Sequence, residues 1–305
     1  MNLEALVQEK LRAVFQDERI RFDKSRFAGG LTNYNYIQEI NGTEYVIRQP
    51  GGMTDQIIDR RQEKVNNTIA SAYGVNSHCI YFDEDSGIKV STYITDSKNM
   101  ACANPSSPQN LAAVSRLMKQ IHSIPQHFAN CFDWQVELAK YEKLIRQLGG
   151  ELFFDYPDLK NQLVSFVQDN VKIASLVPCH NDTVPENFIV DSAGRTYLID
   201  WEYAGMNDPC WDVAAYILES KLSEDAIHGL VHYYFGRPLQ PAEEIKLKSF
   251  MMVQDLLWTA WALIRHYNGD DFLEYCCLRY ERFRKNSKLI TQSLHCSLAD
   301  MVASG

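Results

Sequence analysis

The chain has 305 residues, 46% of them hydrophobic, which is enough to bury a sizeable core in two domains or one large one. Its formal net charge of −9 would repel a polyanion, so we expect no nucleic-acid partner and no binding to an anionic membrane, whereas a cationic small molecule would be attracted. We also expect no signal peptide and no membrane span. The eight cysteines lack metal-site spacing and indicate a cytoplasmic protein with reduced thiols.

The N-terminal third of the chain alternates between strand-like and helical patterns. After a first helical segment, "RIRFDKSRFAGGLTNYNYIQEINGTEYVIRQPGG" alternates apolar and polar residues, and its Asn41-Gly42 dipeptide favours a tight hairpin turn. A helical period follows from Asp55 to Tyr73 and ends at Gly74, and a second hairpin pattern surrounds residues 85–87. These patterns predict a small sheet with one long helix.

A segment rich in small and polar residues, "TDSKNMACANPSSPQ", marks a domain boundary. We place the two domains at residues 1–96 and 97–305. In the second domain we expect helices over residues 107–123, 134–148, 157–174, 211–221, 241–267 and 270–292. Short strands are expected at Leu176–Cys179, Asn187–Val190 and Thr196–Asp200. The whole predicts an α+β fold with a small, β-rich first domain and a larger, mainly helical second one.

The stretch "FAGGLTNYNY" in the first domain suits phosphate binding. It sets Gly29, Gly30, Thr32 and Asn33 between two strands, where backbone N–H groups and short side chains can approach a phosphate group. A Gly-Gly pair in a hairpin is often no more than a turn, so this stretch alone is a weak signal.

A cation and a carboxylate follow in the same domain. Arg48 ends the next expected strand and Glu63 lies on the following helix. A strand cation paired with a helix carboxylate is an arrangement that kinases use to hold phosphates. Gln62, or Arg60 and Arg61, would take the place of Glu63 if the helix register differed, and the alternative for all of them is a set of surface charges.

The stretch "PCHNDTVPENFIV" sets His180, Asp182 and Asn187 between two apolar runs, and Asp200 ends the next strand. Two short strands joined by "DSAGR" would bring Asn187 and Asp200 together, where an amide and a carboxylate offer hard oxygen ligands to Mg²⁺. Asp182, on the loop before them, can orient or deprotonate a hydroxyl. This ordered set is what phosphoryl transfer needs, with His180 as a further catalytic candidate. The alternative is an acidic turn in which His180 fills a core pocket.

Two tryptophans, Trp258 and Trp261, are three residues apart in "MMVQDLLWTAWALIRHY" and therefore share one face of a helix. A place in the core is at least as good an explanation from periodicity alone. Aromatic faces are nevertheless what recognition of a quaternary ammonium group requires, because a cation–π contact contributes about 0.5–2 kcal/mol.

Further substrate candidates lie in "DWEYAGMNDPCWDVAAYILES". Asp212 and Glu219 are seven residues apart, hence on one helical face, and two carboxylates there would favour a quaternary cation. Asp212 is alternatively a helix N-terminal charge. Glu202, Tyr203 and Tyr216 complete the set, with the two tyrosines as possible walls of an aromatic cage.

The segments "HNDTVPENF" and "LIDWEYAGMNDPCWDVAAYILE" resemble the choline and ethanolamine kinase family, most closely the bacterial Lic-type choline kinases, within the aminoglycoside-phosphotransferase-like kinases. The similarity extends over about residues 27–284 and is most specific over residues 179–219. It implies a two-lobed protein-kinase-like fold that binds ATP, with Asp182 as the catalytic base and Asn187 and Asp200 as Mg²⁺ ligands.

The resemblance also supports the proposed roles of the Gly-Gly turn, of Arg48 and of the two tryptophans. The family carries a similar G-G-x-T-N loop over the ATP phosphates, commonly has Arg or Lys at the position of Arg48, and has a similar W-x-x-W at its choline pocket. "HND" and "DWE" stand where a protein kinase has H-R-D and D-F-G, so a protein substrate is disfavoured.

These features together predict a choline kinase that moves the γ-phosphoryl group of ATP to the hydroxyl of choline, giving phosphocholine and ADP. Ethanolamine kinase is the nearest alternative, and thiamine and aminoglycoside kinases share the catalytic frame. A non-enzymatic alternative is an inactive choline-binding protein of kinase fold, which the complete set of Asp182, Asn187 and Asp200 argues against. The sequence gives no indication of the oligomeric state.

Overall fold

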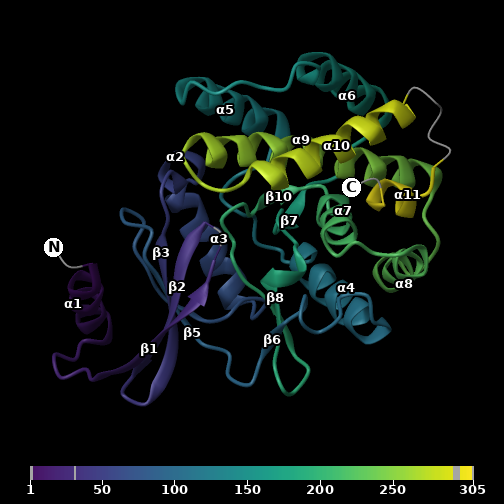
Figure 1. The fold of residues 1–305 in the computed structure, drawn as a ribbon. Coiled ribbons are helices and arrows are strands. Elements are labelled where there is room, and N and C mark those ends of the chain that lie inside the picture. Colours follow the sequence, from purple (N-terminus) through teal and green to yellow (C-terminus); the bar gives the residue numbers. More distant parts are fainter. Residues whose placement is uncertain (1–2, 31, 291–295, 304–305) are drawn as a thin grey trace. The chain divides into compact units, whose positions relative to one another are not determined.

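The computed structural model describes residues 3–30, 32–290 and 296–303 (Figure 1). The chain divides into two compact units, Met1–Asp96 and Ser97–Gly305. The first contains a five-stranded antiparallel sheet and the second is mainly helical, so the expected α+β composition is confirmed. None of the described helices is long and apolar enough to cross a membrane.

The sheet of the first unit has the strand order β1-β2-β3-β5-β4. The expected turn at Asn41-Gly42 joins β2 to β3, and both residues have positive φ angles, 51° and 80°, as a type I′ turn requires. The turn expected at residues 85–87 joins β4 to β5. The strands are β1 (Phe22–Gly29), β2 (Asn33–Ile40), β3 (Thr43–Pro50), β4 (Cys79–Phe82) and β5 (Lys89–Thr92).

Three helices accompany this sheet: α1 (Leu3–Phe15), α2 (Thr54–Ile57) and α3 (Arg60–Ala72). The single helix expected from residue 55 to 73 is interrupted, because the carboxylate of Asp59 accepts hydrogen bonds from the backbone N–H groups of Arg61 and Gln62 and so begins a new helix. Gly74 follows α3 with a φ of 68°, in agreement with its predicted place after the helix end.

The apolar core of the first unit lies between α1 and one face of the sheet. Leu11 of α1 and Ile20 pack with sheet residues, and all members of the cluster are buried. The cluster comprises Leu11, Ile20, Ile40, Ile47, Ile88 and Val90. Alternate residues of the strands supply it, as the period of two in the sequence predicts.

The second unit contains two small sheets. One pairs β7 (Val177–Cys179) with β10 (Gly205–Asn207), and the other has the order β6-β8-β9. Its strands are β6 (Lys98–Asn99), β8 (Phe188–Val190) and β9 (Thr196–Leu198), and a 3₁₀ turn, η1 (Pro185–Asn187), leads into β8. Three of these strands lie where the sequence predicts them, whereas β6 and β10 were not expected.

The helices of the second unit agree with the sequence within a few residues, except that α8 and α11 were not predicted. The expected end of the last long helix at residue 292 lies outside the described residues. The helices are α4 (Pro108–His122), α5 (Trp134–Gln147), α6 (Tyr156–Asn170), α7 (Cys210–Glu219), α8 (Glu224–Phe235), α9 (Pro241–Tyr267), α10 (Leu273–Ile290) and α11 (Leu298–Val302).

Helix α9 forms the centre of the second unit (Figure 1). It packs against α5, α6, α7, α10 and α11, and every side chain from Leu247 to Arg265 is buried. A helix that is buried all round requires neighbours on every side, which explains why the surrounding helices converge on it.

Candidate active site

The turn between β1 and β2 folds back closely on itself. Gly29 and Gly30 have φ angles of 97° and 136°, and a Cβ atom on Gly30 would lie 2.0 Å from the carbonyl oxygen of Asn33. Only glycine fits at Gly30. The Asn33 side chain is buried and its Nδ2 lies 3.4 Å from Oγ1 of Thr32. The sequence predicts a turn between two strands here, which the structure has, while phosphate binding at the turn stays a prediction.

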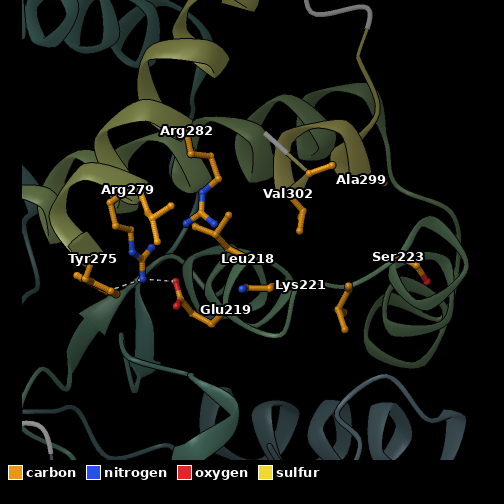
Figure 2. A pocket seen from close by; sticks show the side chains of 12 residues that line it. Leu218, Glu219, Lys221, Ser223, Tyr275, Arg279, Arg282, Ala299 and Val302 are labelled. Atoms are coloured by element: carbon orange, nitrogen blue, oxygen red, sulfur yellow. Dashed lines mark hydrogen bonds and ion pairs between the residues drawn. The ribbon is translucent and has the colours of Figure 1, made fainter. Parts of the chain in front are cut away.

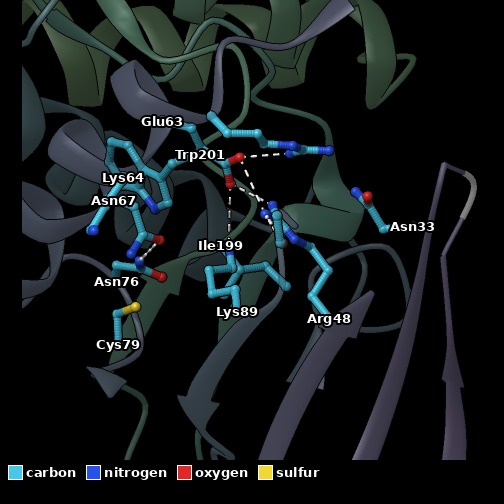
Figure 3. A network of polar contacts seen from close by, with 12 residues as sticks. Asn33, Arg48, Glu63, Lys64, Asn67, Asn76, Cys79, Lys89, Ile199 and Trp201 are labelled. Atoms are coloured by element: carbon cyan, nitrogen blue, oxygen red, sulfur yellow. Dashed lines mark hydrogen bonds and ion pairs between the residues drawn. The ribbon is translucent and has the colours of Figure 1, made fainter. Parts of the chain in front are cut away.

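A buried ion network surrounds Glu63 in the first unit (Figure 3). Arg48 on β3 pairs with both carboxylate oxygens of Glu63 on α3, with Nη2 3.2 Å from Oε2, and it also donates to the carbonyl oxygen of Gly87 over 2.9 Å. Nη1 of Arg60 lies 2.6 Å from Oε2, and Nζ of Lys89 lies 3.7 Å from Oε1. Three cations thus converge on one carboxylate.

The charge balance of this network fixes the protonation of Glu63. Burial would raise the pKa of Glu63, but the charges of Arg48, Lys89 and Arg60 outweigh it and lower the pKa to about 2. Helix α3 directs Glu63 inward and leaves Arg61 exposed, so the helix register is the predicted one. Lys89 was not identified from the sequence, since its approach to Glu63 depends on the pairing of β3 with β5.

In the second unit, one buried carboxylate holds the loop that follows β7. Oδ2 and Oδ1 of Asp212 accept hydrogen bonds from the backbone N–H groups of His180 (2.9 Å) and Asn181 (2.8 Å), and Nε2 of His122 lies 3.0 Å from Oδ2. Thr183 donates its hydroxyl to the backbone oxygen of Asp212 over 2.6 Å. Because loop donors occupy this enclosed carboxylate, the expectation that it faces a substrate cation is wrong. Asp212 is a positioning residue.

His180 is also enclosed and uses both ring nitrogens. Nε2 bonds the carbonyl oxygen of Ile199 over 2.9 Å and therefore carries the proton, which leaves Nδ1 to accept from the backbone N–H of Asp182 over 3.3 Å. The ring packs edge-on against Trp201, with centroids 4.8 Å apart. This geometry favours a role in shaping the loop over the proton transfer that we expected of His180.

Asp182 lies at the turn of the loop, held by Asn187. Nδ2 of Asn187 donates to the carbonyl oxygen of Asp182 over 3.0 Å and to its Oδ2 over 3.2 Å. Burial raises the pKa of Asp182 to about 8, and the negative charges of Asp200 and Glu219 add to the effect. This carboxyl group therefore takes up a proton much more readily than an exposed aspartate, as a group that receives the proton of an alcohol must.

The β8-β9 hairpin brings Asn187 and Asp200 together, as the spacing predicts. The backbone N–H of Ile199 bonds the carbonyl oxygen of Asn187 over 2.9 Å, and Asp200 then leaves the strand with a φ of 69°. Because the side-chain nitrogen of Asn187 is directed to Asp182, its amide oxygen is the atom left for a cation. An amide oxygen beside a carboxylate is a donor set that Mg²⁺ prefers, so these two residues fit the ion.

A row of aromatic side chains lies in the same unit. Tyr203 packs edge-on against Trp258 (centroids 5.0 Å apart), and Trp258 packs in the same way against Trp261 (6.3 Å). Phe272 and Tyr275 continue the row, with centroids 5.1 and 6.4 Å from that of Trp261. Trp258 and Trp261 are each 7% exposed, so most of each indole belongs to the core and only a small part of its surface is open to a ligand.

Glu219 ends α7 beside this aromatic row and is neutralised by an arginine. Nη2 of Arg279 lies 2.5 Å from Oε1 of Glu219 and donates to the hydroxyl of Tyr275 over 2.7 Å (Figure 2). Nη1 of Arg279 reaches Asp255 over 3.1 Å. Arg282 binds Asp255 from the other side. Glu219 therefore does not offer the uncompensated charge that the sequence suggested. Glu219, Tyr275 and Arg279 also line a cavity of about 590 Å³.

The remaining candidates separate into two groups. Tyr216 is fully buried and donates its hydroxyl to the carbonyl oxygen of Pro105 over 3.0 Å, so it is a core residue and not part of an aromatic cage. Tyr203 is half-buried, as is Glu202 next to it. Burial raises the pKa of Tyr203, and Tyr141, Glu202 and Asp182 raise it further. The side-chain nitrogen of Asn181 donates to the backbone oxygen of Tyr203 over 2.9 Å, so the backbone of Tyr203 lies against the loop that follows β7.

The comparison with known protein families shows to which family the chain belongs. The family model for choline/ethanolamine kinases matches residues 25–230, which is more than half of the chain. The chain belongs to the choline/ethanolamine kinase family. Membership makes it a kinase that transfers a phosphate group to an alcohol, and it confirms the family resemblance found in the motifs.

Individual relatives of the family agree with this result. Protein LicA of Haemophilus influenzae is 30% identical over 264 residues, covering 83% of this chain and 76% of the relative, and ethanolamine kinase 2 of Mus musculus is 25% identical over 312 residues (92% and 79%). The crystal structure of choline kinase LicA from Streptococcus pneumoniae has a TM-score of 0.82 and 28% identity, covering 95% of this chain and 100% of that one. The structure of LicA in complex with AMP has a TM-score of 0.81 and 28% identity, over 95% and 99%. The kinase-like fold is thereby confirmed.

Sequence reasoning missed several residues of the candidate site. Phe272 directly precedes α10, and Tyr275 and Arg279 lie in its first two turns, so only the packing of α10 on α9 brings them to the tryptophans. The four-residue spacing of Tyr275 and Arg279, which places both on one helical face, was the only signal available.

Proposed function

We propose that this kinase transfers the γ-phosphoryl group of ATP to the hydroxyl of choline, giving phosphocholine and ADP. The observation that carries the proposal is the aromatic row from Tyr203 through Trp258 and Trp261, which lies in the same unit as Asp182 and Asp200. A trimethylammonium group offers no hydrogen-bond donor, so its affinity must come from aromatic faces and nearby carboxylates.

In this function Asp182 receives the hydroxyl proton of the acceptor, which prepares the oxygen for attack on the γ-phosphorus atom. Asn187 holds the carboxylate in position through its two hydrogen bonds. His180 and Asp212 fix the backbone of the loop. Asn187 and Asp200 would hold Mg²⁺, which when bound neutralises charge on the phosphate oxygens.

We assign the nucleotide phosphates to the first unit. The tight glycine turn offers backbone N–H groups, and the buried pair of Arg48 and Glu63 holds a guanidinium group in a fixed orientation. The LicA structure with AMP supports nucleotide binding by a relative of the same fold. The phosphate-binding residues in this assignment are Gly29, Gly30, Thr32, Asn33, Arg48 and Glu63.

Ethanolamine kinase is the second candidate, since one relative bears that name and ethanolamine carries the same hydroxyl. Its ammonium group has three N–H donors that require acceptors, and Glu219 is already bound to Arg279, which also donates to Tyr275 of the aromatic row. The ion pair between Glu219 and Arg279 therefore favours choline over ethanolamine as the acceptor. Thiamine and aminoglycosides are weaker candidates, and an inactive choline-binding protein would have no need of a carboxylate with the raised pKa of Asp182.

The test is ADP release by the purified protein with ATP and Mg²⁺, offered choline, ethanolamine, thiamine and an aminoglycoside in turn. We expect the highest kcat/KM with choline. A higher kcat/KM with ethanolamine would replace the acceptor and leave the catalytic assignment unchanged, whereas choline binding without ADP release would indicate the inactive binding protein. We place the reaction in the cytoplasm, where ATP is available.

A further inference from the structure

A histidine of α4 lies at the centre of a chain of polar contacts in the second unit. Nε2 of His122 lies 3.0 Å from Oδ2 of Asp212 on α7, and Nδ1 lies 2.6 Å from the hydroxyl oxygen of Tyr234 on α8. The side chain of His122 is 6% exposed and that of Asp212 is fully buried. Helix α4 packs against both α8 and β7. His122 thus connects α8 with the carboxylate that holds the loop following β7.

The partners of this carboxylate decide which ring nitrogen of His122 carries a proton. The two oxygens of Asp212 accept from the backbone N–H groups of His180 and Asn181. An ionised carboxylate can only accept, so we assign the proton of the neutral imidazole to Nε2, which leaves Nδ1 to accept from the hydroxyl of Tyr234. Every donor in the chain from the tyrosine hydroxyl to the carboxylate then has an acceptor.

His122 is the only side chain that donates to the Asp212 carboxylate, among the residues that the structure describes. A buried carboxylate that loses a donor is left partly unsatisfied, which is costly. It would turn or take up a proton, and either change weakens its bonds to the two backbone N–H groups. Asn181, which provides one of these groups, directly precedes Asp182.

A metal ion is the alternative explanation for this cluster. A ring nitrogen of His122, the sulfur of Cys179 and a carboxylate oxygen of Asp212 lie within 4.8 Å of one another. Zinc would require a thiolate, whereas the sulfur of Cys179 lies 3.5 Å from the carbonyl oxygen of Asn207, as a protonated thiol donating to it does. Both oxygens of Asp212 are also occupied by backbone donors. The hydrogen-bonded chain therefore explains the geometry better.

We propose that His122 is a positioning residue for phosphoryl transfer: its Nε2–H orients Asp212, and Asp212 fixes the backbone of the loop that carries Asp182. The proposal rests on the proposed function, in which Asp182 receives the hydroxyl proton. The hydroxyl of Tyr234 fixes the ring of His122 in turn. Loss of this support should displace the base and leave the groups that bind ammonium and nucleotide in place. A displacement of about 1 Å can lower a rate by about 100-fold.

Two amide variants of His122 test whether the donor at Nε2 is what matters. In His122→Gln the side-chain nitrogen extends to the position of Nε2 and can donate to Asp212, whereas in His122→Asn the amide extends only to the position of Nδ1. We expect His122→Asn to lower kcat by about tenfold to 100-fold, with the KM values for choline and ATP within about twofold of the wild type. His122→Gln should keep kcat within about threefold.

Backbone hydrogen exchange gives a second readout that does not depend on activity. The amides of His180 and Asn181 are bonded to Asp212, so their exchange reports directly on the hold of the carboxylate on the loop. His122→Asn should speed their exchange, followed by mass spectrometry of the peptide over residues 179–184. His122→Gln should exchange at the wild-type rate.

The control is Tyr156→Phe, which removes a hydroxyl bonded to Glu142 and should lower the melting temperature without changing kcat or the exchange of this peptide. An equal fall of kcat in the two His122 variants would overturn the proposal, as would a wild-type kcat in His122→Asn. A stoichiometric zinc ion in the purified protein that His122→Asn loses would also overturn it, in favour of the metal site.

Tyr234→Phe keeps the test decisive if His122→Asn does not fold. It removes one half-buried hydroxyl and should lower kcat by about threefold, the effect of one hydrogen bond, with faster exchange of the same peptide. A wild-type kcat and exchange rate would then overturn the proposal. A wild type that phosphorylates no amino alcohol would instead overturn the proposed function, and the exchange rates would still show whether His122 holds the loop.

Discussion

Asn187 donates its side-chain nitrogen to both the backbone oxygen and the Oδ2 atom of Asp182, over 3.0 and 3.2 Å. One amide therefore fixes the orientation of the candidate base while its own oxygen remains for a cation. A change at either residue should alter the geometry of the other. Proton acceptance by Asp182 and metal binding by Asn187 therefore have to be tested with different variants.

The first prediction concerns proton transfer. Asp182→Asn keeps the size of the side chain but cannot accept the hydroxyl proton, so we expect kcat to fall by about 100-fold or more, with the fold and ATP affinity retained. Steady-state kinetics and nucleotide titration measure the two quantities. Asp169→Asn, an exposed change on α6, is the control and should have no effect. A kcat close to the wild-type value would remove Asp182 from the mechanism.

The second prediction separates the two metal candidates. Asp200→Ala removes a carboxylate and should abolish activity at every Mg²⁺ concentration, whereas Asn187→Ala removes a neutral ligand and should recover part of the activity at high Mg²⁺. Mg²⁺ should also raise the melting temperature of the wild type and fail to do so for Asp200→Ala. If both variants kept the wild-type Mg²⁺ dependence, the metal assignment would be wrong.

The third prediction concerns the ammonium group. Trp258→Ala or Trp261→Ala should raise the KM for choline by about tenfold or more, equivalent to about 1.4 kcal/mol, with little change in the KM for ATP. Both indoles are largely buried, so the melting temperature will fall as well. Phe250→Leu on the same helix is the matched control, because it should lower stability and leave the choline KM unchanged. An unchanged choline KM in a folded tryptophan variant would exclude that residue from the pocket.

The fourth prediction compares two carboxylates that share Arg279. Asp255 is fully buried between Arg279 and Arg282, so Asp255→Asn leaves the buried Arg282 without its carboxylate and Arg279 with Glu219 alone, and should cost about 3–5 kcal/mol of stability. Glu219 is partly exposed, and Glu219→Gln should cost about 1 kcal/mol or less while raising the KM for choline. Urea denaturation gives both values. Equal losses of stability would show that Glu219 has only a structural role.

The fifth prediction is a pH dependence of stability. Because the pKa of Glu63 is lowered from 4.5 to about 2, its stabilising effect is complete above about pH 4.5 and is lost as the pH falls towards 2. The difference in unfolding free energy between the wild type and Glu63→Gln should therefore shrink by about 3 kcal/mol across that range. Glu243→Gln, which breaks the exposed pair with Arg237, should change stability by no more than about 1 kcal/mol. A constant difference for Glu63→Gln would contradict the ion network.

The sequence by itself determined the features that depend on short stretches of chain. The turns at Asn41-Gly42 and at Gly29-Gly30 and the meeting of Asn187 with Asp200 all arise between residues close in sequence. Hairpin pairing and glycine geometry are local properties, so residue type and spacing were sufficient to predict them. The family motif lies in the same stretch and was recognisable for the same reason.

Only the tertiary structure decided which charges are available to a ligand. Asp212 and Glu219 look equivalent in sequence, yet the loop that follows β7 encloses the first and Arg279, 60 positions further along the chain, neutralises the second. Charge compensation depends on which distant segments of the chain meet. The burial of α9 among its neighbours sets those meetings, and it is a property of the whole core that no single stretch of sequence contains.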